Sequence, residues 1–152
     1  MKKLILLLAF LVSLGSALAQ DNLFKRLDNT KAVGGYCFGD SITHYLTRLT
    51  PVSINEGGNI EAKVDDDSRS AFNVGAFIPS RVHLVAEGYK IYLASLWFGN
   101  YARVRLYELL CQYLGAPTYR DGAYFWGSTH FTVCYSLDDP ETPNIIIADN
   151  NN

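Results

Sequence analysis

Gly39, Asp40 and Ser41 stand between a short apolar stretch, YCF at 36–38, and a segment with helical spacing. A serine at such a turn can act as a nucleophile, but only when a neighbouring base, most often a histidine, takes the proton of its hydroxyl group. Asp40 or Ser41 can equally cap the helix that follows, because short polar side chains accept hydrogen bonds from the free N–H groups of a first turn. We favour the cap.

The block FGDSIT at 38–43 resembles the nucleophile block of the SGNH or GDSL hydrolases, where a serine follows Gly-Asp between the first strand and the first helix. The resemblance implies a hydrolase with Ser41 as the nucleophile. Those enzymes also carry a Gly-x-Asn-Asp block for the oxyanion hole and an Asp-x-x-His block for the base. Here FGNY at 98–101 lacks the aspartate, and neither His83 nor His130 has an aspartate three residues before it. A small serine hydrolase with Ser41 as its nucleophile is for this reason the alternative function and not the favoured one.

The three cysteines are Cys37, Cys111 and Cys134. Cys37 with His130 or His83 would suit a cysteine peptidase, but Cys37 comes about four residues too early to feel the field of the following helix N-terminus. In an oxidising compartment a disulfide can persist, and an odd count leaves one thiol free or pairs it with another chain. The sequence leaves open which pair would form.

No metal site is predicted. His130 and Cys134 share a face of one expected strand, yet four strand residues separate them by about 13 Å, whereas zinc ligands converge to about 2 Å from one point. The acidic run VDDDSRS at 64–70 lacks the glycine and the distant glutamate of a calcium loop. We expect no metal and no cofactor.

Aromatic residues gather in the second half of the chain. In AYFWG at 123–127, strand alternation sends Tyr124 and Trp126 to one side and Phe125 to the other. If the Tyr124 and Trp126 side stays exposed, the two rings form a contact surface for a carbohydrate or a protein. Tyr124 and Trp126 are the predicted binding site, although aromatic rings of this kind more often pack into a hydrophobic core.

The N-terminus has the layout of a secretory signal peptide. Lys2 and Lys3 precede an apolar run, 4–12, that is too short to span a membrane, and small residues at Ala17 and Ala19 mark a cleavage site. We predict a signal peptide at 1–19 and a mature protein in the periplasm or outside a bacterial cell, without a membrane span.

Removal of the two lysines changes the formal net charge from −2 to −4. Such a charge does not favour nucleic acid, which selects basic surfaces. A cell-envelope glycan or a protein partner remains open, and so does the oligomeric state.

The spacing of apolar residues predicts the helices and strands. Ile42, Tyr45, Leu46 and Leu49 are spaced for one helical face. Val104, Tyr107, Cys111 and Leu114 are spaced in the same way, and Leu110 widens their face. Between and after these helices, alternating segments and the turn at Glu87-Gly88 predict strands and hairpins.

We therefore expect a tether at 20–35 and a single α+β domain at 36–152. The domain would be a two-layer sandwich, a mostly antiparallel sheet with a long helix at 101–114 and a shorter one at 41–49 packed on it. The favoured function is that of an exported, non-catalytic binding or interaction domain of the cell envelope.

Overall fold

The computed structural model describes residues 27–99, 102–136 and 144–151. The predicted signal peptide lies outside these residues. The part of the predicted tether that is described, 27–35, contains the helical residues 27–30 and the strand β1 (Ala32–Val33), which pairs with β2 (Tyr36–Cys37). Leu27 of this segment is only 6% exposed and belongs to the hydrophobic core.

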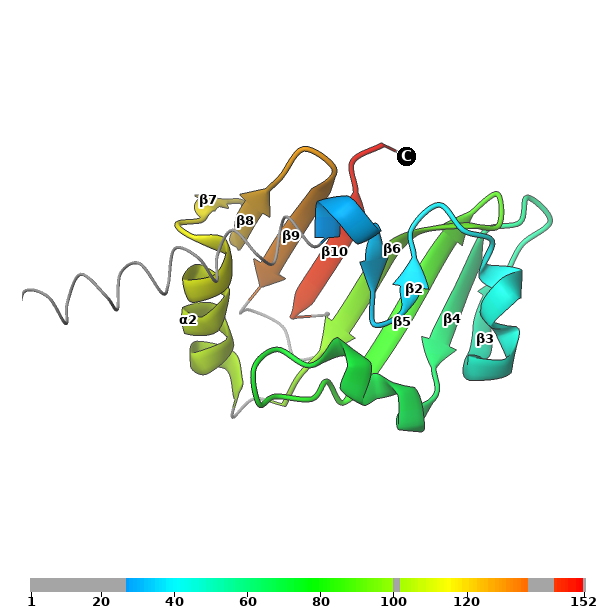
Figure 1. Ribbon diagram of the computed structural model, residues 1–152, viewed down its shortest axis with the longest axis horizontal. Coiled ribbons are helices and arrows are strands. Elements are labelled where there is room, and N and C mark those ends of the chain that lie inside the picture. The colour runs from blue at the N-terminus through cyan, green and yellow to red at the C-terminus, as the bar shows by residue number, and fades with distance from the viewer. Residues whose placement is uncertain (1–26, 100–101, 137–143, 152) are drawn as a thin grey trace, which may run out of the picture.

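One antiparallel sheet of eight strands dominates the molecule (Figure 1). In chain order its strands are β3 (Leu49–Ile54), β4 (Ile60–Val64), β5 (Arg81–Glu87), β6 (Lys90–Trp97), β7 (Thr118–Arg120), β8 (Ala123–Gly127), β9 (Phe131–Ser136) and β10 (Ile145–Asp149). Their order in space is β3-β4-β5-β6-β10-β9-β8-β7. The sheet therefore consists of two meanders joined by the pairing of β6 with β10.

The predicted hairpin between residues 81 and 98 is present as β5 and β6, which pair from Arg81↔Trp97 to Glu87↔Lys90. Gly88 and Tyr89 form its turn, with φ of 53° and 68°. Two central residues with positive φ are the mark of the type I′ turn, whose twist matches that of the flanking strands. Tyr89, which follows Gly88 in the turn, thus has a left-handed backbone conformation that is strained for a residue with a large side chain.

The predicted α+β two-layer sandwich with one long helix is wrong, because the molecule is mostly a large antiparallel sheet with only short helices. The predicted helix at 41–49 is a 3₁₀ helix, η1 (Ile42–Arg48), of which only Ile42 is buried. Leu49 already belongs to β3 and Pro51 lies within that strand. An edge strand tolerates proline because a missing N–H there breaks no bond of the inner ladder.

The remaining helices are η2 (Asp66–Phe72) and α2 (Arg103–Leu114). The helix α2 lies within the predicted range of 101–114. Its predicted buried face is correct at Leu110 and Leu114, and Tyr107 and Cys111 of that face pack half-buried against the core, but it is wrong at Val104. Leu106, Leu110 and Leu114 are buried, whereas Val104 is 72% exposed. Apolar residues occur on more than one side of this helix, and the fit of the three leucines against the sheet decides which side is inside.

The core lies on one face of the sheet, which we call the inner face. Burial alternates residue by residue in β4 and in β9, as expected when one face is covered. The β1–β2 hairpin, residues 27–30 and the η2 segment cross in front of the sheet in Figure 1. We call the opposite side the open face.

Candidate ligand-binding cavity

A cavity of about 370 Å³ lies between the inner face of the sheet and the segments that cover it. Its lining residues come from the N-terminal segment, the η2 segment, α2 and three central strands. They are Leu27, Ala32, Val33, Gly34, Ala71, Phe72, Asn73, Val74, Gly75, Leu96, Leu110, Tyr113, Leu114, Val133, Ile145 and Ile147.

The floor of the cavity is built where the two meanders meet. The register of β10 sets Ile145 opposite Leu96 of β6, and Ile147 opposite Val133 of β9. Residues that are directly opposite share a face, and alternate residues of one strand share it too. These four aliphatic side chains therefore point to the same side and leave no polar group on the floor.

The walls depend on a close approach that only glycine permits. Gly34 has φ of 59°, and a Cβ atom at this position would lie 2.4 Å from the ring of Phe72. Any larger residue would have to displace the ring and would also strain the backbone. Gly34 thus lets the β1–β2 turn close against the end of η2.

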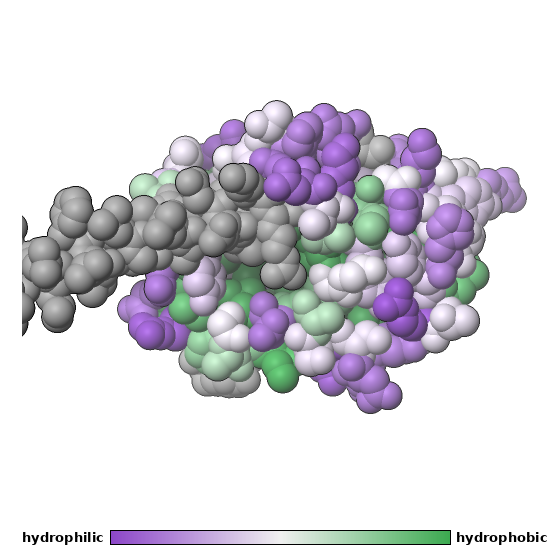
Figure 2. Space-filling view, in the orientation of Figure 1, coloured by the Kyte–Doolittle hydropathy of each residue, from purple (hydrophilic) through white to green (hydrophobic). Residues whose placement is uncertain are grey.

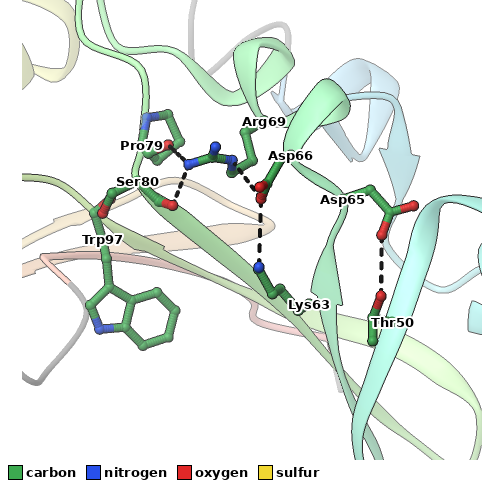
Figure 3. Close-up of polar contacts among 8 residues, drawn as sticks. All are labelled: Thr50, Lys63, Asp65, Asp66, Arg69, Pro79, Ser80 and Trp97. Atoms are coloured by element: carbon green, nitrogen blue, oxygen red, sulfur yellow. Dashed lines mark hydrogen bonds and ion pairs between the residues drawn. The ribbon is translucent and has the colours of Figure 1, made fainter.

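The η2 wall is anchored by polar contacts at its outer side (Figure 3). Asp66 pairs with Lys63 of β4 at 3.5 Å and with Arg69 at 3.3 Å. Arg69 also donates to the carbonyl oxygens of Pro79 and Ser80, just before β5. Asp66 and Arg69 of the acidic run at 64–70 therefore help to hold η2 on the sheet.

Most side chains that line the cavity are apolar. No lining residue carries a charged side chain, and Asn73 and Tyr113 supply its polar side-chain groups. The Asn73 side-chain amide already donates to the carbonyl oxygen of Gly75 at 3.0 Å. In Figure 2 hydrophobic residues gather in a hollow near the middle of this side of the molecule, with hydrophilic residues around it. Such a lining favours an uncharged, apolar occupant.

Ser41 lies away from the cavity and occupies the N-cap position of η1, as favoured, but its side chain makes no capping hydrogen bond. Its hydroxyl group is 2.7 Å from that of Thr43. Within the described residues, no hydrogen bond joins Ser41 to a histidine. The part of the chain that the structure describes thus places no histidine where it could take the Ser41 proton.

The predicted binding residues Tyr124 and Trp126 both lie on the inner face. Trp126 is 3% exposed, and its indole N–H donates to the carbonyl oxygen of Gly115 at 2.8 Å. Tyr124 is half-buried, with its ring centroid 4.6 Å from that of Tyr107 on α2. The alternation was predicted correctly, but α2 covers this side, so the expected exposed surface is not present there.

The three thiols of Cys37, Cys111 and Cys134 are free. Within the described part of the chain, no cluster of three histidine, cysteine or acidic side chains could hold a metal ion. In the same ranges no helix has the length and apolar character needed to cross a membrane.

Sequence reasoning did not find the cavity. Strand alternation could have placed Ile145 and Ile147 on one face, since the expected last strand was NIIIAD at 144–149. It could not show that the covering segments leave a space above them, because that depends on contacts between segments far apart in the sequence. Comparisons with family models, curated proteins and solved structures find no match to this chain.

Proposed function

We propose that this protein is an exported, non-catalytic binding protein that holds a small apolar ligand in the cavity above β6, β9 and β10. The observation that supports the proposal is the cavity itself, about 370 Å³ in volume and lined without charge. Ligand sites in proteins are usually concave, mostly apolar and roughly 300–1,000 Å³ in volume.

The lining also favours one chemical class of ligand. A charged group inside would lose its hydration without gaining a charged partner, which costs several kcal/mol. A glycan would need many hydrogen-bonding partners, and besides backbone groups the lining offers only the side chains of Asn73 and Tyr113. A hydrocarbon chain, such as the acyl chain of a lipid, gains by leaving water and asks for no polar partner. Export, which follows from the predicted signal peptide, would bring the protein to the lipids of the cell envelope.

The test is binding of a fluorescent naphthylamine probe, with a free fatty acid as competitor. Ile147→Phe puts extra volume into the cavity, and Ile146→Phe adds the same volume on the open face. We expect the probe to bind the unaltered protein and to be displaced by the fatty acid. Affinity should fall at least about tenfold in Ile147→Phe, which corresponds to about 1.4 kcal/mol, and change little in Ile146→Phe.

Thermal unfolding of both variants controls for lost structure, because overpacking costs about 1–3 kcal/mol. A milder variant, Val133→Leu, adds a single methylene to the cavity floor and should weaken binding in the same direction. The proposal would be contradicted by a protein that binds neither probe nor fatty acid, or by equal affinities in folded Ile147→Phe and Ile146→Phe.

A further inference from the structure

The cavity on the inner face differs from one end to the other in its exposure to solvent. Its floor is shielded, because Leu96, Val133 and Ile145 are each at most 2% exposed. The lining residues Asn73 and Gly75, which follow η2, are exposed. The cavity therefore opens at residues 73–75, which we call the mouth. A ligand that enters there rests one end on aliphatic side chains and leaves the other end at the mouth.

The hydroxyl group of Tyr113 lies at this mouth. Tyr113 belongs to the last turn of α2, lines the cavity and packs half-buried against the core. A Cβ atom on Gly75 would lie 3.8 Å from the Tyr113 hydroxyl oxygen, which places that oxygen beside the mouth. The hydroxyl group makes no hydrogen bond with another described residue, so it is able to donate one to a ligand and to accept one.

The side-chain amide of Asn73 lies on the other side of the same glycine. Its nitrogen donates to the carbonyl oxygen of Gly75 at 3.0 Å. Because a carbonyl oxygen can only accept, this bond fixes which end of the amide faces Gly75. The Asn73 Oδ1 atom has no hydrogen-bond partner among the described residues and is left as an acceptor. The mouth thus offers one acceptor and one hydroxyl group, both uncharged.

This pair of groups discriminates between the head groups that an apolar ligand can carry. A hydroxyl head can accept from Tyr113 and donate to Asn73 Oδ1 at the same time. A carboxylate can only accept, so it would bring two acceptors together at Asn73. Charged heads of either sign lose part of their hydration at the mouth and meet no charged lining residue in return.

We propose that the ligand is an uncharged amphiphile, a hydrocarbon chain that ends in a hydroxyl group. Its chain lies on the floor formed by Leu96, Val133 and Ile145, and its hydroxyl group lies between Asn73 and Tyr113. This inference rests on the proposed function and adds to it the class of the head group and the direction of binding. Tyr113 is then a specificity-determining residue, which recognises the head and not the chain.

The test compares octanol with nonane as competitors of the naphthylamine probe, because nonane has the same number of non-hydrogen atoms and no polar group. Tyr113→Phe removes only the hydroxyl oxygen. In this variant the affinity for octanol should fall roughly three- to tenfold, the range expected for one neutral hydrogen bond, and the loss should be confined to octanol. Asn73→Ala should act in the same direction. Octanoate should compete more weakly than octanol for the unaltered protein.

The matched control is Tyr119→Phe, which removes the same atom from a side chain on β7 that is 62% exposed and outside the cavity lining. It should bind both competitors like the unaltered protein. Thermal unfolding of each variant shows whether the fold is kept.

The outcomes separate this inference from the proposed function. A protein that binds neither the probe nor nonane would refute the cavity as a ligand site, and the head-group assignment with it. If nonane binds but Tyr113→Phe leaves the affinity for octanol unchanged, the head-group assignment alone is overturned. Equal losses of octanol and nonane in Tyr113→Phe would also overturn it, because Tyr113 would then only shape the cavity.

Discussion

The hydroxyl group of Ser41 faces that of Thr43 at 2.7 Å, at the start of a 3₁₀ helix. A hydroxyl–hydroxyl contact cannot take up the serine proton, since neither group is a base near neutral pH. The residues around Ser41 resemble a hydrolase motif, but the reaction also needs a base, which this motif does not supply.

We predict that a fluorophosphonate probe does not label this protein at Ser41. The reason is the absence of a histidine hydrogen-bonded to Ser41 among the described residues. Mass spectrometry of the treated protein, with Ser41→Ala as the comparison, measures the outcome. Labelling of the unaltered protein that disappears in Ser41→Ala would establish an activated serine and favour the hydrolase alternative.

Single residues also show where sequence reasoning about the site stops. Alternation placed Tyr124 and Trp126 together on one side of β8, which the register confirms. It could not tell which side α2 covers, because that is fixed by the packing of the leucines of α2 and by the bond from Trp126 to Gly115. The direction of a side chain is local information, whereas its burial is not.

Among the elements, α2 shows the same division. The helix runs over Arg103–Leu114, with Ala102 at its N-cap position and Gly115 at its C-cap position, two residues later at its start than the predicted 101–114. Its inward side follows Leu106, Leu110 and Leu114 at spacings of four. The predicted face shares Leu110 and Leu114 with this row, but it is turned towards Val104, which is exposed. A helix with apolar residues on several sides has no single periodicity that selects the buried one.

The helix supplies a matched pair of substitutions. Leu106 is fully buried, so Leu106→Ala should lower the free energy of unfolding by about 2–5 kcal/mol. Val104 is 72% exposed, so Val104→Ala should change it by less than about 0.5 kcal/mol. Urea unfolding followed by circular dichroism measures both, and a larger loss at Val104 than at Leu106 would contradict the orientation of α2.

For the whole molecule, sequence periodicity located most strands but not the sheet that they form. A hairpin such as β5–β6 can be predicted locally, because a glycine turn separates two segments in which apolar and polar residues alternate. The pairing of β6 with β10 joins residues about 50 positions apart, and no local pattern encodes it. That one long-range pairing turns two meanders into an eight-stranded sheet and places Ile145 and Ile147 on the cavity floor, which is why both the fold class and the cavity were missed.

Buried tyrosines link the stability of the whole fold to alkaline pH. Tyr135 is completely buried and its hydroxyl group donates to the carbonyl oxygen of Arg103. Burial raises the pKa of Tyr135 from 10.0 to about 12, against a smaller lowering by Arg103. Burial likewise raises the pKa of Tyr36 and of Tyr45. The neutral phenol is therefore the form that the folded state accommodates.

The sign of the pH effect follows from proton binding. Below a pH of about 10 both states keep the Tyr135 proton, so this residue adds no pH dependence. Between 10.0 and about 12 the unfolded chain releases the proton while the folded chain holds it, so the free energy of unfolding falls as pH rises.

Urea midpoints measured from about pH 8 to about pH 11 should decline above pH 10. The decline should be shallower in Tyr135→Phe, although this variant is less stable at neutral pH for want of one hydrogen bond. Tyr119→Phe, at a side chain that is 62% exposed, should decline like the unaltered protein, and equal slopes in all three proteins would refute the assignment to Tyr135.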